Sequence, residues 1–300
     1  MTGTAAEAAR QAAALLLGVR RGAPRLAALP PALAPGTRPE AYAIQHELLR
    51  QAGLARGGWK ATLFDARNGI CAPIPAQALY DSPAARAPAR LPTLSQPAPR
   101  AAALRVEPEI AFRFGTALPP LPAGQEYSRE QVLAAVASVH AVLELVASRF
   151  ADESAVTQLE RVADAFMNEA LVVGTACTDW RALDLAALPL VVQVAGRGHF
   201  SGIAVHPVGD PVRPLAWIAN HLAALGIGIA AGEIVTTGSC AGAPALAPGE
   251  SAEAQFSGLG SVAFRYGDCA GGAGGARFQR RFVHAQSSGW RRTSFSSPAA

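Results

Sequence analysis

Lysine, paired cysteines and long apolar runs are scarce or missing in this chain of 300 residues. Half of the residues are hydrophobic, yet no stretch reaches the ~18–20 uninterrupted apolar residues that a membrane-spanning helix needs. The four cysteines are far apart and form no Cys-x-x-Cys pair: Cys71, Cys177, Cys240 and Cys269. Neither a zinc site nor a disulfide framework is therefore predicted, and a reducing cytoplasm is the expected location. The apolar run near the N-terminus contains Glu7 and lacks a basic leader, so we expect an amphipathic helix there rather than a signal peptide.

Charge is also sparse, because only 16% of the residues are charged. The net charge is +4, and residues 268–300 account for all of it with five arginines and one aspartate. No basic stripe interleaved with aromatic residues is present, so a nucleic-acid partner is not predicted.

Of the 26 basic residues, 25 are arginine, which leaves Lys60 as the one lysine (26 − 25 = 1). A compositional preference for arginine explains the low number but not why one lysine remains. An ammonium group is compact enough to enter a pocket and can lose its proton when it is desolvated, which a guanidinium cannot do. Lys60 is therefore either a chance survivor on the surface or a functional residue, and composition alone does not decide.

Hydrophobic periodicity predicts an α+β chain. Residues 1–57 show helical spacing, residues 58–65 indicate a short strand, and residues 72–100 hold seven prolines and are expected to form an irregular excursion. The sequence LRVEPEIAFRF (104–114) alternates like a strand, with Pro108 expected at an edge or a bulge.

After this strand, Ser128 and Gln131 form a capping-box pattern that begins a predicted helix with apolar positions Val132, Val136 and Val139. The stretch 142–150 is predicted as the next strand. Later elements are expected as strands at 189–195, 199–206, 231–237 and about 253–266, with a helix from Pro214 to Gly226.

Many strands with few long helices between them favour a largely antiparallel or mixed sheet that is closed or rolled. We expect three parts: an N-terminal helical segment (1–57), a catalytic β-roll domain (58–267) and an Arg/Gly/Ser-rich disordered or loosely packed tail (268–300).

Glu107 and Glu109 lie two residues apart and therefore on one face of the predicted strand, about 7 Å apart at Cα. Two neighbouring carboxylates repel each other unless arginine, water or a cation compensates them. This pair alone favours a solvated strand face with cross-strand ion pairs over a metal site. Glu144 adds weight to a metal site, because it lies in an apolar run where a charge needs a partner. Three carboxylates suit hard cations such as Mg²⁺, Mn²⁺ or Ca²⁺.

Five short motifs occur in an order and spacing that resemble the 2-keto-4-pentenoate hydratase and 4-oxalocrotonate decarboxylase family of the fumarylacetoacetate hydrolase superfamily. They are GWK (58–60), VEPEIAF (106–112), LELVASRF (143–150), VAD (162–164) and TTGSCAG (236–242). The resemblance covers about residues 1–266. It implies an α+β fold, the mixed β-roll of the fumarylacetoacetase C-terminal type, behind an N-terminal helical segment.

The resemblance also implies a site. Glu107, Glu109 and Glu144 match three carboxylates that bind Mg²⁺ or Mn²⁺, and Lys60 matches a pocket lysine beside the 2-oxo group of the substrate. A lowered pKa would allow this lysine to relay a proton. Ser239 matches a residue near the substrate carboxylate, where Thr237 and Gly238 offer further hydrogen bonds. Asp164 matches the aspartate of the VAD motif and is expected among the substrate-binding residues, and Asp81 is a further candidate for proton transfer.

The implied activity is that of a lyase: a hydratase that adds water to a 2-hydroxy-2,4-dienoate or 2-oxo-4-enoate and gives a 4-hydroxy-2-oxo acid. Decarboxylation of a 4-oxalocrotonate-type acid is the alternative, as is a non-catalytic partner subunit of the same fold. The expected partners are a small 2-oxo acid and further copies of the chain, with a complex with a decarboxylase or aldolase of the same aromatic catabolic pathway left open.

Some residues depart from the resemblance or argue against other chemistry. ATLFD follows GWK and AFMNEA follows VAD, and both stretches differ from what the family usually carries, which leaves the substrate open. His46 and Glu47 are adjacent and diverge by about 100° on a helix, which disfavours the His/Glu dyad of the hydrolases. His140 and His221 are expected to be structural residues on amphipathic helices.

Overall fold

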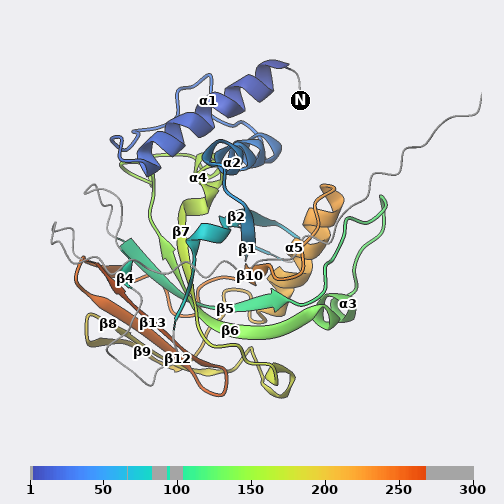
Figure 1. The fold of residues 1–300 in the computed structure, drawn as a ribbon, viewed down its shortest axis with the longest axis vertical. Coiled ribbons are helices and arrows are strands. Elements are labelled where there is room, and N and C mark those ends of the chain that lie inside the picture. Colours follow the sequence, from blue (N-terminus) through green and yellow to red (C-terminus); the bar gives the residue numbers. More distant parts are fainter. Residues whose placement is uncertain (1–2, 66, 83–92, 95–103, 268–300) are drawn as a thin grey trace, which may run out of the picture. The chain divides into compact units, whose positions relative to one another are not determined.

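The computed structural model describes residues 3–65, 67–82, 93–94 and 104–267, which form two β-sheets and five α-helices (Figure 1). The helices are α1 (Gly3–Arg20), α2 (Arg38–Ala52), α3 (Arg129–Ala134), α4 (Gln158–Ala163) and α5 (Val212–Ala224). The mixed α+β fold with helices at its N-terminal end confirms the predicted fold class.

The larger sheet has eight strands in the order β2-β1-β10-β5-β6-β7-β3, with β11 pairing with β5. Their bounds are β1 Arg56–Leu63, β2 Gly69–Pro75, β3 Leu79–Asp81, β5 Leu104–Phe114, β6 Val136–Val146, β7 Asn168–Val173, β10 Ile234–Thr236 and β11 Ala245–Leu246. β1 runs parallel to β10, and β3 runs parallel to β7. Since the other neighbours are antiparallel, the sheet is mixed.

The smaller sheet has the order β4-β13-β12-β8-β9. Its strands are β4 Thr93–Leu94, β8 Pro189–Val194, β9 Arg197–Ile203, β12 Ser251–Phe256 and β13 Gly260–Tyr266. Alternate residues of β8 are buried, as expected for a strand with one face on the core. The strand predicted at 253–266 is in fact the hairpin of β12 and β13.

The N-terminal helices are specified locally and then anchored to the large sheet. Thr37 and Glu40 form a complete capping box at the start of α2, and Gly53 ends this helix in the left-handed conformation. From the buried face of α2, Gln45 donates hydrogen bonds to the carbonyls of Cys71 and Val162. The helix predicted in this region and the strand predicted at 58–65 are both confirmed.

The helix predicted from Ser128 is correct at its start and wrong in its length. The capping box of Ser128 and Gln131 is present, but the helix ends at Ala134, and Val136, Val139 and His140 belong to β6. β6 pairs with β5 on one side and β7 on the other and is buried along nearly its whole length. A strand buried on both faces reads as a continuous apolar run, which spacing alone cannot distinguish from a buried helix. For the same reason the strand predicted at 142–150 starts six residues earlier.

Two further predictions need correction. Residues 72–75 continue β2 and residues 79–81 form β3, so only part of the proline-rich stretch is irregular, and residues 83–92 and 95–103 lie outside the described part. Pro108 lies within β5, which has partners on both sides, and not at an edge of the sheet. It is tolerated because it faces the gap between β10 and β11, where its carbonyl accepts a hydrogen bond from the Cys240 amide (2.8 Å).

No helix in the described ranges is long and apolar enough to cross a membrane. The three-part division at residues 57 and 267 and the cytoplasmic location stay predictions, and the predicted tail lies outside the described residues.

Candidate metal centre

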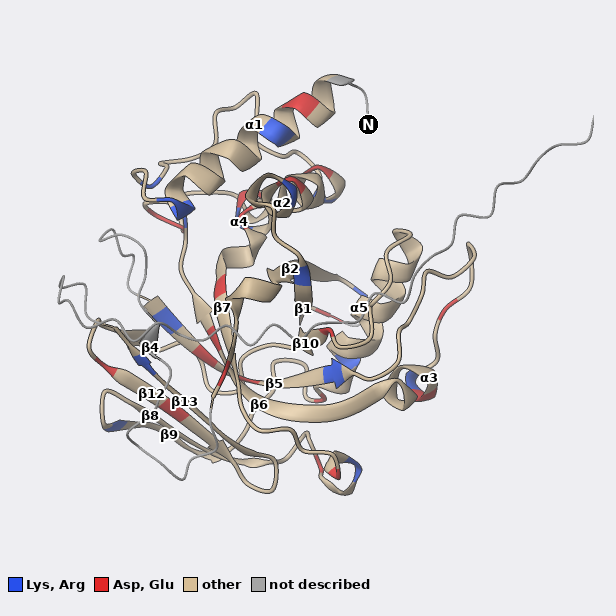
Figure 2. Cartoon of the chain, viewed as in Figure 1, with Lys and Arg blue, Asp and Glu red and all other residues tan. Residues whose placement is uncertain are grey.

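Strands β5 and β6 bring three carboxylates together on one face of the large sheet. Glu107 lies directly opposite Glu144 in the antiparallel register, and Glu109 lies two residues further along β5. One oxygen from each of the three lies within 4.8 Å of the others. Glu109 and Glu144 are 1% and 0% exposed, whereas Glu107 is half-buried. Figure 2 shows acidic positions on β5 and β6 and a basic position on β1.

The two oxygens of Glu144 have different surroundings. Oε1 accepts hydrogen bonds from Lys60 Nζ (2.7 Å) and from the Asn168 side-chain amide (2.8 Å). Oε2 is buried and has no hydrogen-bond partner among the described residues. A buried carboxylate oxygen without a partner is costly, so its environment fits a divalent cation.

Glu109 is held from β10 and the loop that follows it. The Thr236 hydroxyl and the Gly238 amide (2.9 Å) both donate to Glu109 Oε2. β10 is short, but it pairs with β1 and β5 at once, and it therefore fixes the distance between Lys60 and the carboxylates.

The carboxylates have little access to solvent, and this burial raises the pKa values of Glu107 and Glu109. Burial, and then the negative charges of Glu144 and Glu107, raise the pKa of Glu109 to about 8. Burial also raises the pKa of Glu107.

Lys60 is 4% exposed on β1, and its pKa moves in the opposite direction to the lowered value that a proton relay would need. Burial lowers the pKa of Lys60, but the attraction of Glu144, Glu107 and Glu109 outweighs burial, and the net direction is upward. Its ammonium also donates to the Phe166 carbonyl (3.2 Å) and lies 5.0 Å from the centre of the Phe166 ring.

The Phe166 carbonyl comes from an unusual turn. Ala165, Phe166 and Met167 have φ values of 49°, 47° and 63°, so three consecutive non-glycine residues are left-handed. Each such residue costs of the order of 1–3 kcal/mol, and such conformations persist only where the surroundings enforce them. The turn leads directly into β7, which begins at Asn168.

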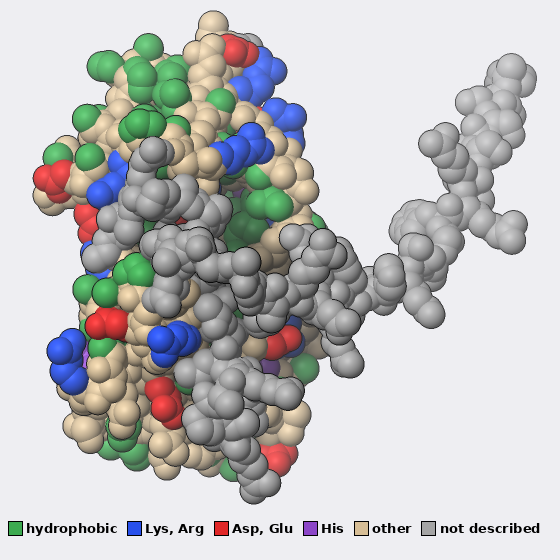
Figure 3. Space-filling view, turned by 60° about the vertical axis from the view of Figure 1, so that its left-hand side comes forward, with side chains coloured by type: hydrophobic (Ala, Val, Ile, Leu, Met, Phe, Trp, Pro, Cys, Tyr) green, Lys and Arg blue, Asp and Glu red, His purple; other side chains and the backbone are tan. Residues whose placement is uncertain are grey.

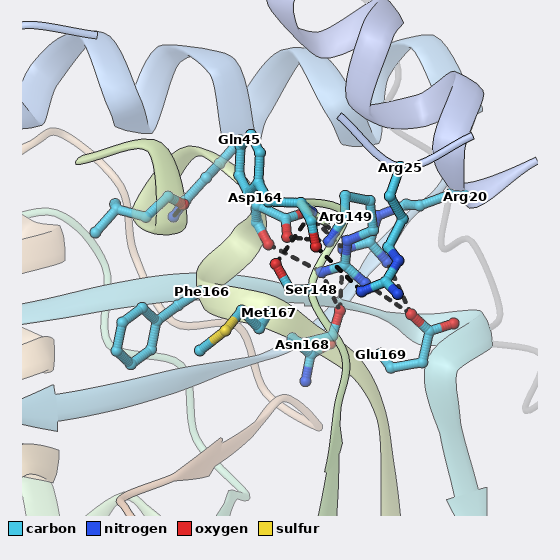
Figure 4. Close-up of polar contacts among 12 residues, drawn as sticks. Arg20, Arg25, Gln45, Ser148, Arg149, Asp164, Phe166, Met167, Asn168 and Glu169 are labelled. Carbon is cyan, nitrogen blue, oxygen red and sulfur yellow. Dashed lines mark hydrogen bonds and ion pairs between the residues drawn. The ribbon is translucent and has the colours of Figure 1, made fainter. Parts of the chain in front are cut away.

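Asp164 precedes this turn and is completely buried, away from the three carboxylates. It accepts hydrogen bonds from the Nε and the backbone amide of Arg149 (2.5 and 3.0 Å). Figure 4 shows Asp164 and Arg149 together on one side of the turn, with Phe166 and Met167 pointing to the other side. The predicted contact of Asp164 with substrate stays a prediction, and its described contacts are with arginine.

The remaining predicted site residues lie on two segments, the loop after β10 and the end of β3. Thr237 is buried and donates to the Ile110 carbonyl, and Ser239 donates to the Gly242 carbonyl in the same loop. Asp81 is exposed at the end of β3, and it acts on the pKa of Arg113 and His140 rather than on that of the glutamates. Its role in proton transfer also stays a prediction.

The sequence interpretation missed Asn168, Thr236 and the Phe166 carbonyl. Asn168 was visible as a polar residue just before the apolar stretch ALVV, and Thr236 as the first residue of TTGSCAG. The carbonyl had no sequence signal, because nothing in AFM announces a left-handed turn without glycine.

Comparisons with known proteins show the family and the fold of the chain. The fumarylacetoacetate (FAA) hydrolase C-terminal family matches residues 72–265. A 2-hydroxyhexa-2,4-dienoate hydratase of Comamonas testosteroni is 35% identical over 162 residues, which are 54% of this chain and 60% of the relative. A 4-oxalocrotonate decarboxylase of a Pseudomonas species is 31% identical over 162 residues, 53% of this chain and 59% of the relative. The chain thus spans less than two thirds of the length of these relatives.

Among solved structures, the fold is similar to that of 4-oxalocrotonate decarboxylase from Pseudomonas putida G7 complexed with magnesium and adipate. The TM-score is 0.73 at 21% identity, and the match covers 87% of this chain and 97% of the other. A fumarylpyruvate hydrolase from Pseudomonas aeruginosa in complex with Mn²⁺ and pyruvate has a TM-score of 0.51 at 16% identity, covering 72% and 90%. Because the family match extends over more than half of the sequence, the chain belongs to the fumarylacetoacetate hydrolase C-terminal family.

Proposed function

We propose that this protein is a divalent-metal-dependent lyase, a hydratase that adds water to a 2-hydroxy-2,4-dienoate or 2-oxo-4-enoate to give a 4-hydroxy-2-oxo acid. The observation that carries the proposal is the convergence of three carboxylates, one of which keeps a buried oxygen without a described partner (Glu144 Oε2), with Lys60 beside them. Relatives named as hydratases support the choice of reaction.

Glu107, Glu109 and Glu144 would hold the metal. Carboxylate oxygens suit Mg²⁺ or Mn²⁺, which keep coordination positions for water and substrate. When bound, the ion supplies Lewis-acid polarisation of the 2-oxo group. The two solved structures described with magnesium and with Mn²⁺ support this choice of ion.

Lys60 acts in this proposal as a hydrogen-bond donor. Its contact with Glu144 Oε1 (2.7 Å) places the ammonium beside the carboxylates, where it would stabilise negative charge on the 2-oxo oxygen while the substrate exchanges a proton between its enol and keto forms. Thr237, Gly238 and Ser239 would orient the substrate carboxylate, with hydroxyls and a backbone amide as donors. Asp81 is proposed as a proton-transfer group. Asp164 is proposed as a substrate-binding group.

The test is to incubate the protein with a 2-hydroxydienoate and Mg²⁺. The proposal expects loss of dienoate absorbance without release of CO₂. Glu107→Gln should abolish this activity while the protein still folds. Unchanged activity of Glu107→Gln would show that the carboxylate cluster is not the metal site.

A second candidate is decarboxylation, which the 31%-identical decarboxylase favours. Release of CO₂ from an oxalocrotonate-type acid would identify it. A non-catalytic partner subunit is distinguished by calorimetry, since such a subunit would bind neither Mn²⁺ nor oxalate, a mimic of a 2-oxo acid. Assembly into a homo-oligomer or with another enzyme of the pathway is part of the same proposal.

A further inference from the structure

The left-handed turn of Ala165, Phe166 and Met167 has two sides with different partners. On one side, the Phe166 carbonyl accepts from Lys60 and the Phe166 ring covers its ammonium. Immediately after the turn, the Asn168 side chain donates to Glu144 Oε1. The turn therefore supplies neighbours to two members of the candidate site.

The other side of the turn is held by a single buried guanidinium. Arg149, about 3% exposed, donates from Nη2 to the carbonyls of Asp164 (3.1 Å) and Asn168 (3.4 Å). These two carbonyls stand immediately before and after the turn. Arg149 Nε binds the Asp164 side chain as well, so one side chain fixes both ends of the strained segment (Figure 4).

Helix α1 extends this clamp. Arg20 is its last residue and donates to the Asn168 carbonyl (3.0 Å), and its guanidinium lies 3.7–3.8 Å from the carboxylates of Glu169 and Asp164. Arg149 also pairs with Glu169 (2.8 Å). The guanidinium groups of Arg20 and Arg149 thus both contact the carboxylates of Asp164 and Glu169. Both also lie against the carbonyl of Asn168, the first residue of β7.

We propose that Arg149 and Asp164 are positioning residues for the site, which act by holding the left-handed turn so that Phe166 faces Lys60 and Asn168 faces Glu144. The proposal rests on the proposed function only in treating Lys60 and Glu144 as members of an active site. Without the clamp, the strained turn relaxes toward ordinary backbone conformations and withdraws both contacts.

The test uses Lys60 as a built-in probe, because it is the chain's one lysine. Arg149→Lys retains the charge beside Asp164 but cannot form the planar fork that reaches two carbonyls. Arg56→Lys is the matched control: Arg56 also joins a carboxylate, Glu233 (2.5 Å), and a carbonyl, Gly228 (3.3 Å), away from the turn. Both variants and the wild type are treated, free of metal, with an amine-selective acylating reagent, and the label at position 60 is followed by peptide mass spectrometry.

The proposal expects Lys60 in Arg149→Lys to react about tenfold faster than in the wild type, equivalent to ~1.4 kcal/mol of lost protection. Arg56→Lys should react at the wild-type rate. An unchanged rate in folded Arg149→Lys, or an equal increase in Arg56→Lys, would overturn the proposal. If Arg149→Lys does not fold, Arg20→Lys decides. Loss of one hydrogen bond to the Asn168 carbonyl should raise the rate about threefold, and no rise would overturn the proposal.

A calorimetric titration with Mn²⁺ separates the two proposals. If the wild type binds no Mn²⁺, the proposed function fails, while the labelling result still decides whether the clamp positions Lys60. If the wild type binds Mn²⁺, Arg149→Lys should bind it about tenfold more weakly, because Asn168 no longer orients Glu144. Wild-type affinity in that variant would contradict the part of the proposal that concerns Glu144.

Discussion

At the scale of single residues, the site is characterised by the surroundings of two buried charged side chains, Lys60 and Glu144. Lys60 has no solvent to stabilise its charge, so the carboxylates around it do so. One oxygen of Glu144 has no donor in the part of the chain that the structure describes. Composition marked Lys60 and the apolar run marked Glu144, but neither could show that the two are 2.7 Å apart, because that contact crosses β1, β10, β5 and β6.

Removal of the lysine charge should separate binding from turnover. Lys60→Met takes away a cation that competes with the metal for Glu144, so the affinity for Mn²⁺ in calorimetry should increase or stay equal. Turnover should fall by roughly 10²–10³, the cost of removing a donor to a developing oxyanion. Loss of Mn²⁺ affinity in parallel with turnover would contradict this role. Arg56→Met is the matched control. It removes another partly buried cation, whose partner is Glu233 and not one of the three glutamates of the candidate metal site.

The pKa of Glu109 predicts how the stability of the metal-free protein depends on pH. Its folded pKa, about 8, lies above the ordinary value of 4.5 that an unfolded chain would show. The contribution of the protonated carboxyl is fully present below about pH 4.5 and is lost as pH rises through about 8. The free energy of unfolding from denaturant titrations should therefore fall across this window.

Glu109→Gln should flatten that slope, because the amide does not titrate. Added Mn²⁺ should displace the proton, so its stabilising effect should grow as pH rises through the same window. A slope that is equally steep in the variant would show that another group is responsible.

At the scale of elements, the sequence predicted structure well where a local signal agreed with the environment. The capping boxes at Thr37 and Ser128 marked the starts of α2 and α3 correctly. The interpretation failed where burial removed the signal: β6 is covered on both faces, and its apolar positions at 136 and 139 matched helical spacing from 132. Pro108 was placed at an edge because a gap between two partner strands cannot be read from the sequence of one strand.

The left-handed turn provides a test at this scale. Ala165→Gly removes the steric cost of a positive φ and should raise the free energy of unfolding by roughly 1 kcal/mol, measured by denaturant titration. The control is Ala43→Gly inside α2, which should lower it by a similar amount because glycine is unfavourable in a helix. If both variants are destabilised equally, position 165 is not strained as described.

At the scale of the molecule, the large sheet collects the site from segments that are far apart in the chain. The matched family region begins at residue 72, yet Lys60 lies before it, on β1, and reaches the carboxylates through β10. The N-terminal helices also take part, because Gln45 of α2 and Arg20 of α1 bind carbonyls on either side of the left-handed turn. Hydrophobic side chains gather over these helices at the top of Figure 3. On α1, Leu15 is 37% exposed.

Glu107, Glu109 and Glu144 are proposed to bind one divalent cation. The sharpest measurement is anomalous scattering from Mn²⁺ soaked into crystals of the protein together with oxalate. A single strong peak is expected at about 2.0–2.4 Å from an oxygen of each glutamate, with oxalate bound to the same ion. Crystals with well-ordered glutamates and no peak among them, at Mn²⁺ concentrations that saturate a magnesium enzyme, would contradict it.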